Sequence, residues 1–169
     1  LKEAGLSSVD VNLSVSDGAF AGAVDAGQLY QNSGAAAGVN INIVQEPADG
    51  YWSNVWLKKP WCACYWSGRA TEDWMFSTAY ESGVPWNDTG WENERFQSLL
   101  LQGRAELDTG LRGEIYREMQ AICRDEGGTV VPMYQNYVDA KSNRVEHSGQ
   151  TGNLWMLDNL RSCKRWWSA

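Results

Sequence analysis

Hydrophobic and polar residues alternate strictly in two short segments near the start of the chain. Residues 9–15, VDVNLSV, place aliphatic side chains on one side and Asp10, Asn12 and Ser14 on the other. Residues 39–44, VNINIV, repeat the alternation. A period of two is typical of a β-strand with one buried face. Both segments are therefore predicted to be strands.

The segment between these strands is predicted to be a helix. Residues 19–37 are rich in alanine, with Phe20, Val24 and Leu29 placed to face a sheet and Gly38 placed to end the helix. A strand, a helix and a second strand within so few residues form a βαβ unit. Such a unit implies parallel pairing and a right-handed crossover.

Aromatic residues dominate the next part of the chain. A helix is expected over residues 49–58, followed by a third, apolar strand over Trp61–Trp66. Residues 67–90 then read as a long irregular segment that carries an arginine, acidic residues and further aromatic rings. Ligands of open α/β sheets bind beyond the carboxyl ends of the strands, and long loops in compact domains are usually functional. This segment is therefore the candidate binding region.

Two amphipathic helices and a short strand are predicted after the loop. The first helix should begin at a capping box formed by Thr89 and Glu92, and the second should be capped by Asp108 or Thr109 and end at residues 127–128. Residues 129–134 read as an edge strand, because Pro132 cannot donate to a sheet. The apolar positions expected to face the core are Phe96, Leu99, Leu100, Gly103, Leu111, Ile115, Met119 and Ile122.

The composition of the chain argues against several classes of function. The net charge of −7 argues against general binding to nucleic acid, and no apolar run is long enough for a membrane span. The single histidine, His147, lies in a polar run expected to be a surface loop, which argues against Ser-His-Asp catalysis and multi-histidine metal sites. The four cysteines lack zinc spacing, and a Cys123–Cys163 disulfide stays open. No catalytic residue, metal or cofactor is therefore expected.

Longer motifs give the chain a resemblance to a known family. The segments AAGVNINIV and DGYWSNVWLKKPWCACYWSG, and the block from Trp86 to Tyr134, resemble the C-terminal part of the family 5 extracellular solute-binding proteins. These are the peptide- and oligopeptide-binding receptors of bacterial ABC importers. The most specific spacing joins Asn87, Leu99, Arg104, Asp108, Arg112, Tyr116, Gln120 and Pro132.

The resemblance implies an architecture and partners. The fold would be α/β: one lobe of the type II periplasmic-binding-protein kind, with an open, mostly parallel sheet and flanking helices, as a fragment of a two-lobe protein. Residues 1–135 would form the second ligand-binding lobe, and residues 136–169 a hinge crossing that returns to the first lobe. The N-terminal lobe would lie outside this chain. The partners would be a small-molecule or peptide ligand and an ABC permease in the inner membrane.

The same resemblance implies export. The receptor would be periplasmic, and because the chain begins with Leu and not Met, a signal peptide is expected upstream. The function would be to bind a peptide or other small polar solute between the lobes and to deliver it to the permease. The identity of the ligand and the oligomeric state stay open.

One position departs from the family. Peptide-binding members carry an aspartate just after the Trp-x-Gly of the strand, where it holds the α-amino group of the ligand, and this chain has Arg69. A guanidinium suits a carboxylate or phosphate, so an anionic ligand group is expected. Alternatively, Arg69 pairs with Glu72 or Asp73 at the base of the loop. The predicted ligand-binding residues are Trp66, Arg69, Glu72, Asp73, Trp74, Tyr80, Trp86 and Asn87.

An enzyme is the alternative function. Tryptophan platforms with carboxylates also suit glycoside hydrolysis. Glu72 and Asp73 are adjacent in the sequence, however, and on an extended segment they would point apart. A binding protein that performs no catalysis is the preferred interpretation.

Overall fold

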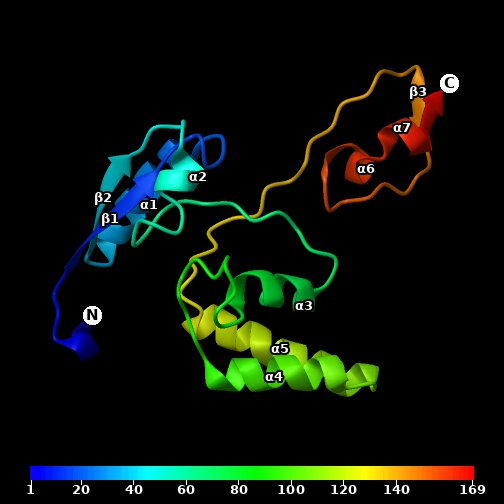
Figure 1. Cartoon of the computed structure of the whole chain (residues 1–169). Helices are drawn as coiled ribbons and strands as arrows, with labels where there is room; N and C mark the ends of the chain where they lie inside the picture. Colours follow the sequence, from blue (N-terminus) through cyan, green and yellow to red (C-terminus); the bar gives the residue numbers. More distant parts are fainter. The chain divides into compact units, whose positions relative to one another are not determined.

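A computed structural model describes residues 1–169 (Figure 1). The chain divides into two compact units, Leu1–Trp66 and Ser67–Ala169, and each is described by itself. The first unit contains a 3-10 turn at Lys2–Ala4, β1 (Val9–Val15), α1 (Ala23–Ala36), β2 (Val39–Gln45) and α2 (Tyr51–Asn54). The second contains α3 (Glu72–Met75), a π-helical turn (Phe76–Tyr80), α4 (Glu94–Ala105), α5 (Thr109–Glu126), β3 (Val145–His147), α6 (Met156–Leu160), α7 (Ser162–Arg165) and β4 (Trp166–Ser168).

The predicted βαβ unit is confirmed. Strands β1 and β2 pair in parallel, from Val9 opposite Val39 to Val15 opposite Gln45, and α1 connects them (Figure 1). The helix covers one face of this small sheet, where Leu13, Val15 and Ile41 are buried and Val24 packs against them. Leu29, also expected to face the sheet, is 69% exposed, so that expectation is wrong. The mixed α/β class with a parallel sheet and flanking helices is therefore correct.

The prediction of a full third strand is wrong. Only one parallel bridge, from Ser14 to Cys62, continues the sheet. Its two bonds run from the Ser14 amide to the Trp61 carbonyl (3.1 Å) and from the Ala63 amide to the Ser14 carbonyl (2.8 Å). Beyond this point the Tyr51 hydroxyl donates to the Ala63 carbonyl at 2.6 Å, so a side chain takes the place of a strand partner.

The helix expected over residues 49–58 is much shorter than predicted. Regular α-helix is confined to α2, and turns continue as far as residue 58. Leu57 adopts a left-handed backbone with φ of 61°, which a continuing right-handed helix does not allow. Of the face expected to hold Trp52, Val55 and Trp56, only Val55 is buried, together with Tyr51, Ala19 and Ala23. Trp52 is 40% exposed, so this prediction holds only in part.

The segment predicted to be irregular contains helical structure. Thr71 caps α3 by accepting a hydrogen bond from the Trp74 amide at 3.3 Å, and the π-helical turn follows directly. The Thr-Glu-Asp sequence explains this beginning, because a hydroxyl at the N-cap and acids in the first turn both stabilise a helix N-terminus. The predicted extended conformation of Glu72 and Asp73 is therefore wrong.

Helices α4 and α5 are confirmed, with one corrected cap. Asn93 caps α4 by accepting from the Phe96 amide at 2.9 Å, so the expected Thr89–Glu92 capping box is wrong. Asp108 caps α5 as predicted, accepting from the Leu111 amide at 2.9 Å. The buried residues of the helix pair and the π-helical turn are Phe76, Phe96, Leu99, Leu100 and Met119. Leu111 is more than half exposed, unlike the rest of the predicted stripe.

The last part of the chain departs most from the predictions. Residues 129–134 form no strand, and Val130, Val131 and Tyr134 are exposed. A strand needs a hydrogen-bonding neighbour, and this unit offers none to that segment. His147 lies in β3, which pairs antiparallel with β4, and not in a loop. No helix of the chain combines the length and apolarity that a membrane crossing requires.

Candidate functional site

Arg69, which is partly buried, and Trp74, which is exposed, form a pair at the start of the second unit. The Arg69 guanidinium lies 5.5 Å from the centre of the Trp74 ring, a distance typical of a cation–π contact. Its Nη1 donates to the Ser67 carbonyl at 2.9 Å and to the Ser67 hydroxyl at 3.0 Å. Trp74 is 55% exposed. The pair thus presents a cation and an indole ring from a short, capped segment of backbone.

Asp73 belongs to an internal network. Its carboxylate accepts from Arg104 Nε at 2.8 Å, from the Ser77 hydroxyl at 3.0 Å and from the Tyr116 hydroxyl at 3.2 Å. Arg104 also lies 3.6 Å from a carboxylate oxygen of Glu81. The carboxylate therefore ties α3 to both long helices. Sequence reasoning treated Asp73 as a ligand group or a partner of Arg69 and missed its contact with Arg104.

The network shifts two pKa values in opposite directions. The hydrogen bonds from Arg104 hold the pKa of the Asp73 carboxyl below its usual range, against the opposing effect of partial burial. Burial, together with the nearby Asp73 charge, raises the pKa of the Tyr116 phenol. At neutral pH, Asp73 is therefore an ionised acceptor and Tyr116 a neutral donor, which is the arrangement that the observed hydrogen bonds require.

Tyr80 lies in the aromatic core of the second unit. Its ring meets Phe76 at 6.2 Å and Trp91 at 6.4 Å between ring centres, both edge to face. Burial raises the pKa of its phenol. The contacts of the Tyr80 ring are therefore packing contacts within this core.

Asn87 and Trp86 occupy the turn that follows. The Asn87 side-chain amide donates to the Trp91 carbonyl at 2.8 Å, and its oxygen accepts from the Thr89 hydroxyl at 3.2 Å. These contacts fix the turn, as asparagine side chains commonly do. Trp86 is about half exposed, and Glu72 is exposed on the first turn of α3.

Trp66 belongs to the first unit, whereas the other seven predicted residues belong to the second. It meets Trp56 edge to face at 6.3 Å, and Trp56 meets Trp52 at 5.8 Å. Trp52 in turn meets Tyr51 and Tyr65. This chain of edge-to-face rings was missed from the sequence, although the spacing of Trp52 and Trp56, four residues apart, was a signal for it.

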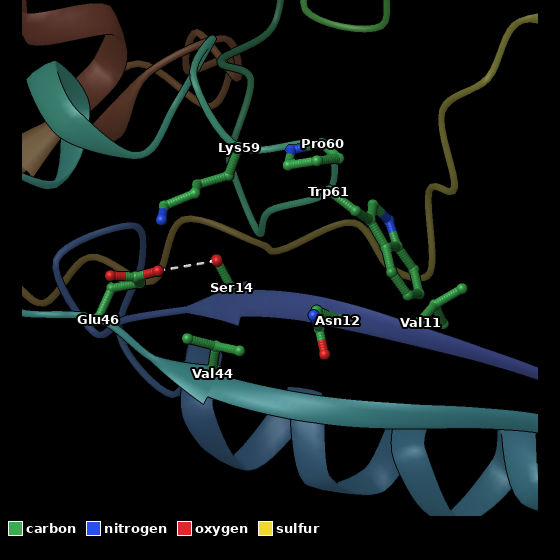
Figure 2. A pocket seen from close by; sticks show the side chains of 8 residues that line it. All are labelled: Val11, Asn12, Ser14, Val44, Glu46, Lys59, Pro60 and Trp61. Carbon is green, nitrogen blue, oxygen red and sulfur yellow. Dashed lines mark hydrogen bonds between the residues drawn. The ribbon is translucent and has the colours of Figure 1, made fainter.

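A pocket beside the sheet was also missed. It has a cavity volume of about 510 Å³ and lies entirely within the first unit. Figure 2 shows it between β1 and the segment that carries Lys59 and Trp61. It lies near the carboxyl ends of the parallel strands, where α/β sheets usually bind ligands. The lining residues are Val11, Asn12, Ser14, Val44, Glu46, Lys59, Pro60 and Trp61.

The possible metal ligands and the cysteines form neither a metal-binding cluster nor a disulfide. Three or more His, Cys, Asp or Glu side chains do not gather anywhere in an arrangement that could hold a metal ion. None of the four cysteines forms a disulfide, so the Cys123–Cys163 disulfide left open by the sequence is not formed. Burial raises the pKa of the Cys123 thiol to about 12, which keeps it protonated and unreactive at neutral pH.

Comparison with known proteins identifies relatives. No protein-family profile matches the chain. Over 48 residues, 28% of this chain, it is 44% identical to the oligopeptide-binding protein OppA of Bacillus subtilis. The fold resembles that of HbpA2 from Haemophilus parasuis, with a TM-score of 0.62 and 19% identity over 76% of the chain. The chain therefore resembles OppA in one short segment of its sequence and HbpA2 in its fold.

A second solved structure has a similar fold. The substrate-binding protein of an ABC transporter, CtaP from Listeria monocytogenes, matches with a TM-score of 0.54 and 21% identity over 73% of the chain. The chain covers 27% of HbpA2 and 26% of CtaP, and the segment matched to OppA is 9% of that protein. The chain therefore spans about a quarter of the length of each of these two solved structures.

Proposed function

We propose that the chain is part of the C-terminal lobe of an exported solute-binding receptor of an ABC importer. In this proposal a second lobe, encoded outside the chain, closes on it around a peptide or other small polar solute. The closed receptor then delivers the solute to a permease in the inner membrane. Closure requires only that the ligand binds the closed state more tightly than the open one. Residues 1–135 would serve as the binding lobe and residues 136–169 as the hinge crossing.

The Arg69–Trp74 pair is the observation that carries this proposal. The guanidinium offers a positive charge for a carboxylate, and the exposed indole offers a surface for stacking. Hydrogen bonds from Arg69 to Ser67, together with the capped turn of α3, hold the two side chains in place. Such preorganisation reduces the conformational cost of binding.

The other predicted residues take supporting roles in the proposal. Asp73 would hold α3 against α4 and α5, since its carboxylate already accepts hydrogen bonds from three side chains, those of Arg104, Ser77 and Tyr116. Asn87 would shape the rim of the cleft through its contact with Trp91, and the half-exposed Trp86 would face the ligand. Trp66, Glu72 and Tyr80 are kept as candidates for ligand contact.

The hydrolase alternative gains no support from the contacts. Glu72 is exposed, whereas Asp73, its neighbour on the same helical turn, is bonded to Arg104. A glycosidase needs two carboxylates that flank the scissile bond. This pair does not have that arrangement.

Titration of the receptor with both lobes present tests the proposal. The probes are tri-L-alanine and its C-terminal amide, and the measurement is isothermal titration calorimetry alongside intrinsic tryptophan fluorescence. The free carboxylate should bind roughly 10-fold more tightly than the amide, because only the former accepts a charge-assisted pair from Arg69. Arg69→Gln should remove that difference.

Arg124→Gln is the matched control, because Arg124 is an exposed arginine that pairs with Asp125 on α5. It should leave both affinities unchanged. Unchanged discrimination in Arg69→Gln, or hydrolysis of a glycoside panel by the receptor, would contradict the proposal.

A further inference from the structure

The pocket beside β1 has one charged end and one apolar end. Figure 2 shows Glu46 and Lys59 at one end, and Trp61 and Val11 at the other. Its volume of about 510 Å³ belongs to one compact unit, so the site does not depend on how the two units are arranged. None of its residues belongs to the Arg69–Trp74 pair, so it is independent of the proposed function.

The carboxylate at the charged end is held in position. The hydroxyl of Ser14, a residue that is 5% exposed, donates to Glu46 Oε1 at 2.9 Å (Figure 2). The Glu46 amide also donates to the Val15 carbonyl at 2.8 Å, which continues the pairing of β1 with β2 past the end of the strand. One carboxylate oxygen is thus oriented by the protein, and the group keeps acceptor capacity for a cationic ligand.

The ammonium group at the same end comes from another segment. Lys59 and Glu46 form no direct ion pair, although both line the pocket. The backbone beside Lys59 is anchored to the sheet, because the Trp61 carbonyl accepts from the Ser14 amide at 3.1 Å. A separate anion and cation at one end of a cavity match a ligand that itself carries both charges.

The opposite end suits an apolar side chain. Trp61 is partly buried and meets Tyr30 edge to face at 5.7 Å, which fixes the indole. Val11 completes this wall, whereas Val44 lies opposite Ser14, nearer the charged end (Figure 2). Ligand pockets of proteins typically combine such apolar surface with a few convergent polar groups.

We propose that this pocket binds the zwitterionic head of a free α-amino acid with an apolar side chain. The ligand ammonium would pair with Glu46, its carboxylate with Lys59, and its side chain would lie against Trp61 and Val11. The two charges of an α-amino acid lie close together, as do the two protein groups that would meet them at one end of the pocket.

The test titrates the 169-residue chain with three probes and follows backbone amide resonances by NMR. The probes are L-leucine, N-acetyl-L-leucine, which lacks the ammonium, and L-leucinamide, which lacks the carboxylate. L-leucine at up to about 20 mM, enough to detect millimolar affinity, should shift the resonances of Asn12, Ser14 and Glu46 and the Trp61 indole. Each derivative should bind roughly 10-fold more weakly, since each leaves one charged group of the protein without a partner.

Two variants assign the charges. Glu46→Gln keeps an acceptor for Ser14 and should weaken L-leucine about 10-fold while equalising L-leucine and N-acetyl-L-leucine. Lys59→Met should likewise weaken the binding of L-leucine about 10-fold, and should make L-leucine and L-leucinamide bind equally. Lys58→Met, at the exposed neighbouring position, is the matched control and should change nothing. An amide spectrum with wild-type dispersion verifies the fold of each variant.

Three results would overturn the proposal: no shifts at these residues, equal binding of all three probes, or binding that is indifferent to both variants. None of them bears on the Arg69–Trp74 site. Conversely, a failure of the tri-alanine titration leaves this pocket unaffected, so the two proposals can be separated.

Discussion

The two units of the chain are stabilised in different ways. The first combines a small aliphatic core under a parallel strand pair with an open face, on which Asn40 and Asn42 donate across to Asp10 and Asn12, both at 2.9 Å. The second has an aromatic core between helices, fastened by the Asp73–Arg104 contact. Aliphatic strands follow from local alternation, whereas the second unit depends on side-chain contacts between residues far apart in the sequence.

The largest expected difference between the units comes from Phe96→Ala. Phe96 is fully buried among Phe76, Trp91 and Leu100, so the truncation should destabilise the second unit by about 3–5 kcal/mol. Hydrogen exchange by mass spectrometry should show faster exchange in α4 and α5 with β1 and β2 unchanged. Leu101→Ala, at an exposed position of the same helix, is the control. Equal acceleration in both units would mean that they unfold as one.

A glycine substitution should act on the first unit instead. A Cβ at Gly34 would lie 2.9 Å from the Val39 carbonyl oxygen and 3.0 Å from Ile41 Cδ1, because α1 approaches the strand closely there. Gly34→Ala should therefore cost about 1–3 kcal/mol in urea unfolding. Gly113→Ala on α5, where the nearest atom is an Arg117 nitrogen at 4.0 Å, should instead stabilise by about 0.5–1 kcal/mol. The same sign for both substitutions would contradict this account.

Asp73→Asn should have the smallest effect, and the effect should depend on pH. Because the folded state holds the pKa of Asp73 below its usual value, the wild-type carboxylate stabilises the fold above the unfolded pKa. That contribution, about 1 kcal/mol for a partly exposed pair, is lost as the pH falls through the lowered folded pKa. The Asn variant lacks it at every pH.

Urea unfolding at pH 7 and pH 3 checks this sign. The difference between wild type and Asp73→Asn should be present at pH 7 and smaller at pH 3. Glu118→Gln removes the exposed pair with Arg95 and serves as the control, with a smaller change at pH 7. A gap that widens on acidification would show that Asp73 does not act as an ionised acceptor.

Local patterns predicted the elements whose signals are periodic. The alternation around Leu13 and Ile41 identified both strands, and the spacing of Phe96, Leu99 and Met119 identified the buried faces of α4 and α5. These signals suffice because the spacing of apolar residues within one segment shows which face of that segment is buried.

Contacts between distant residues could not be predicted in this way. Nothing near Asp73 in the sequence indicates that Arg104 and Tyr116 bond its carboxylate. The strand expected over Trp61–Trp66 has the composition of a strand but lacks a partner beyond Cys62. Glu46 and Lys59 carry no local signal for a pocket, since only the bridge from Ser14 brings the Lys59 segment to the sheet.

The Arg69–Trp74 pair is proposed to contact a ligand in a two-lobe receptor. A crystal structure of that receptor with both lobes and bound tri-L-alanine would show whether it does. The peptide carboxylate should lie within hydrogen-bond distance of the Arg69 guanidinium, and the peptide should lie against the Trp74 ring. A peptide bound elsewhere in the receptor would contradict the proposal. In that case Arg69 and Trp74 would face solvent or contact only protein.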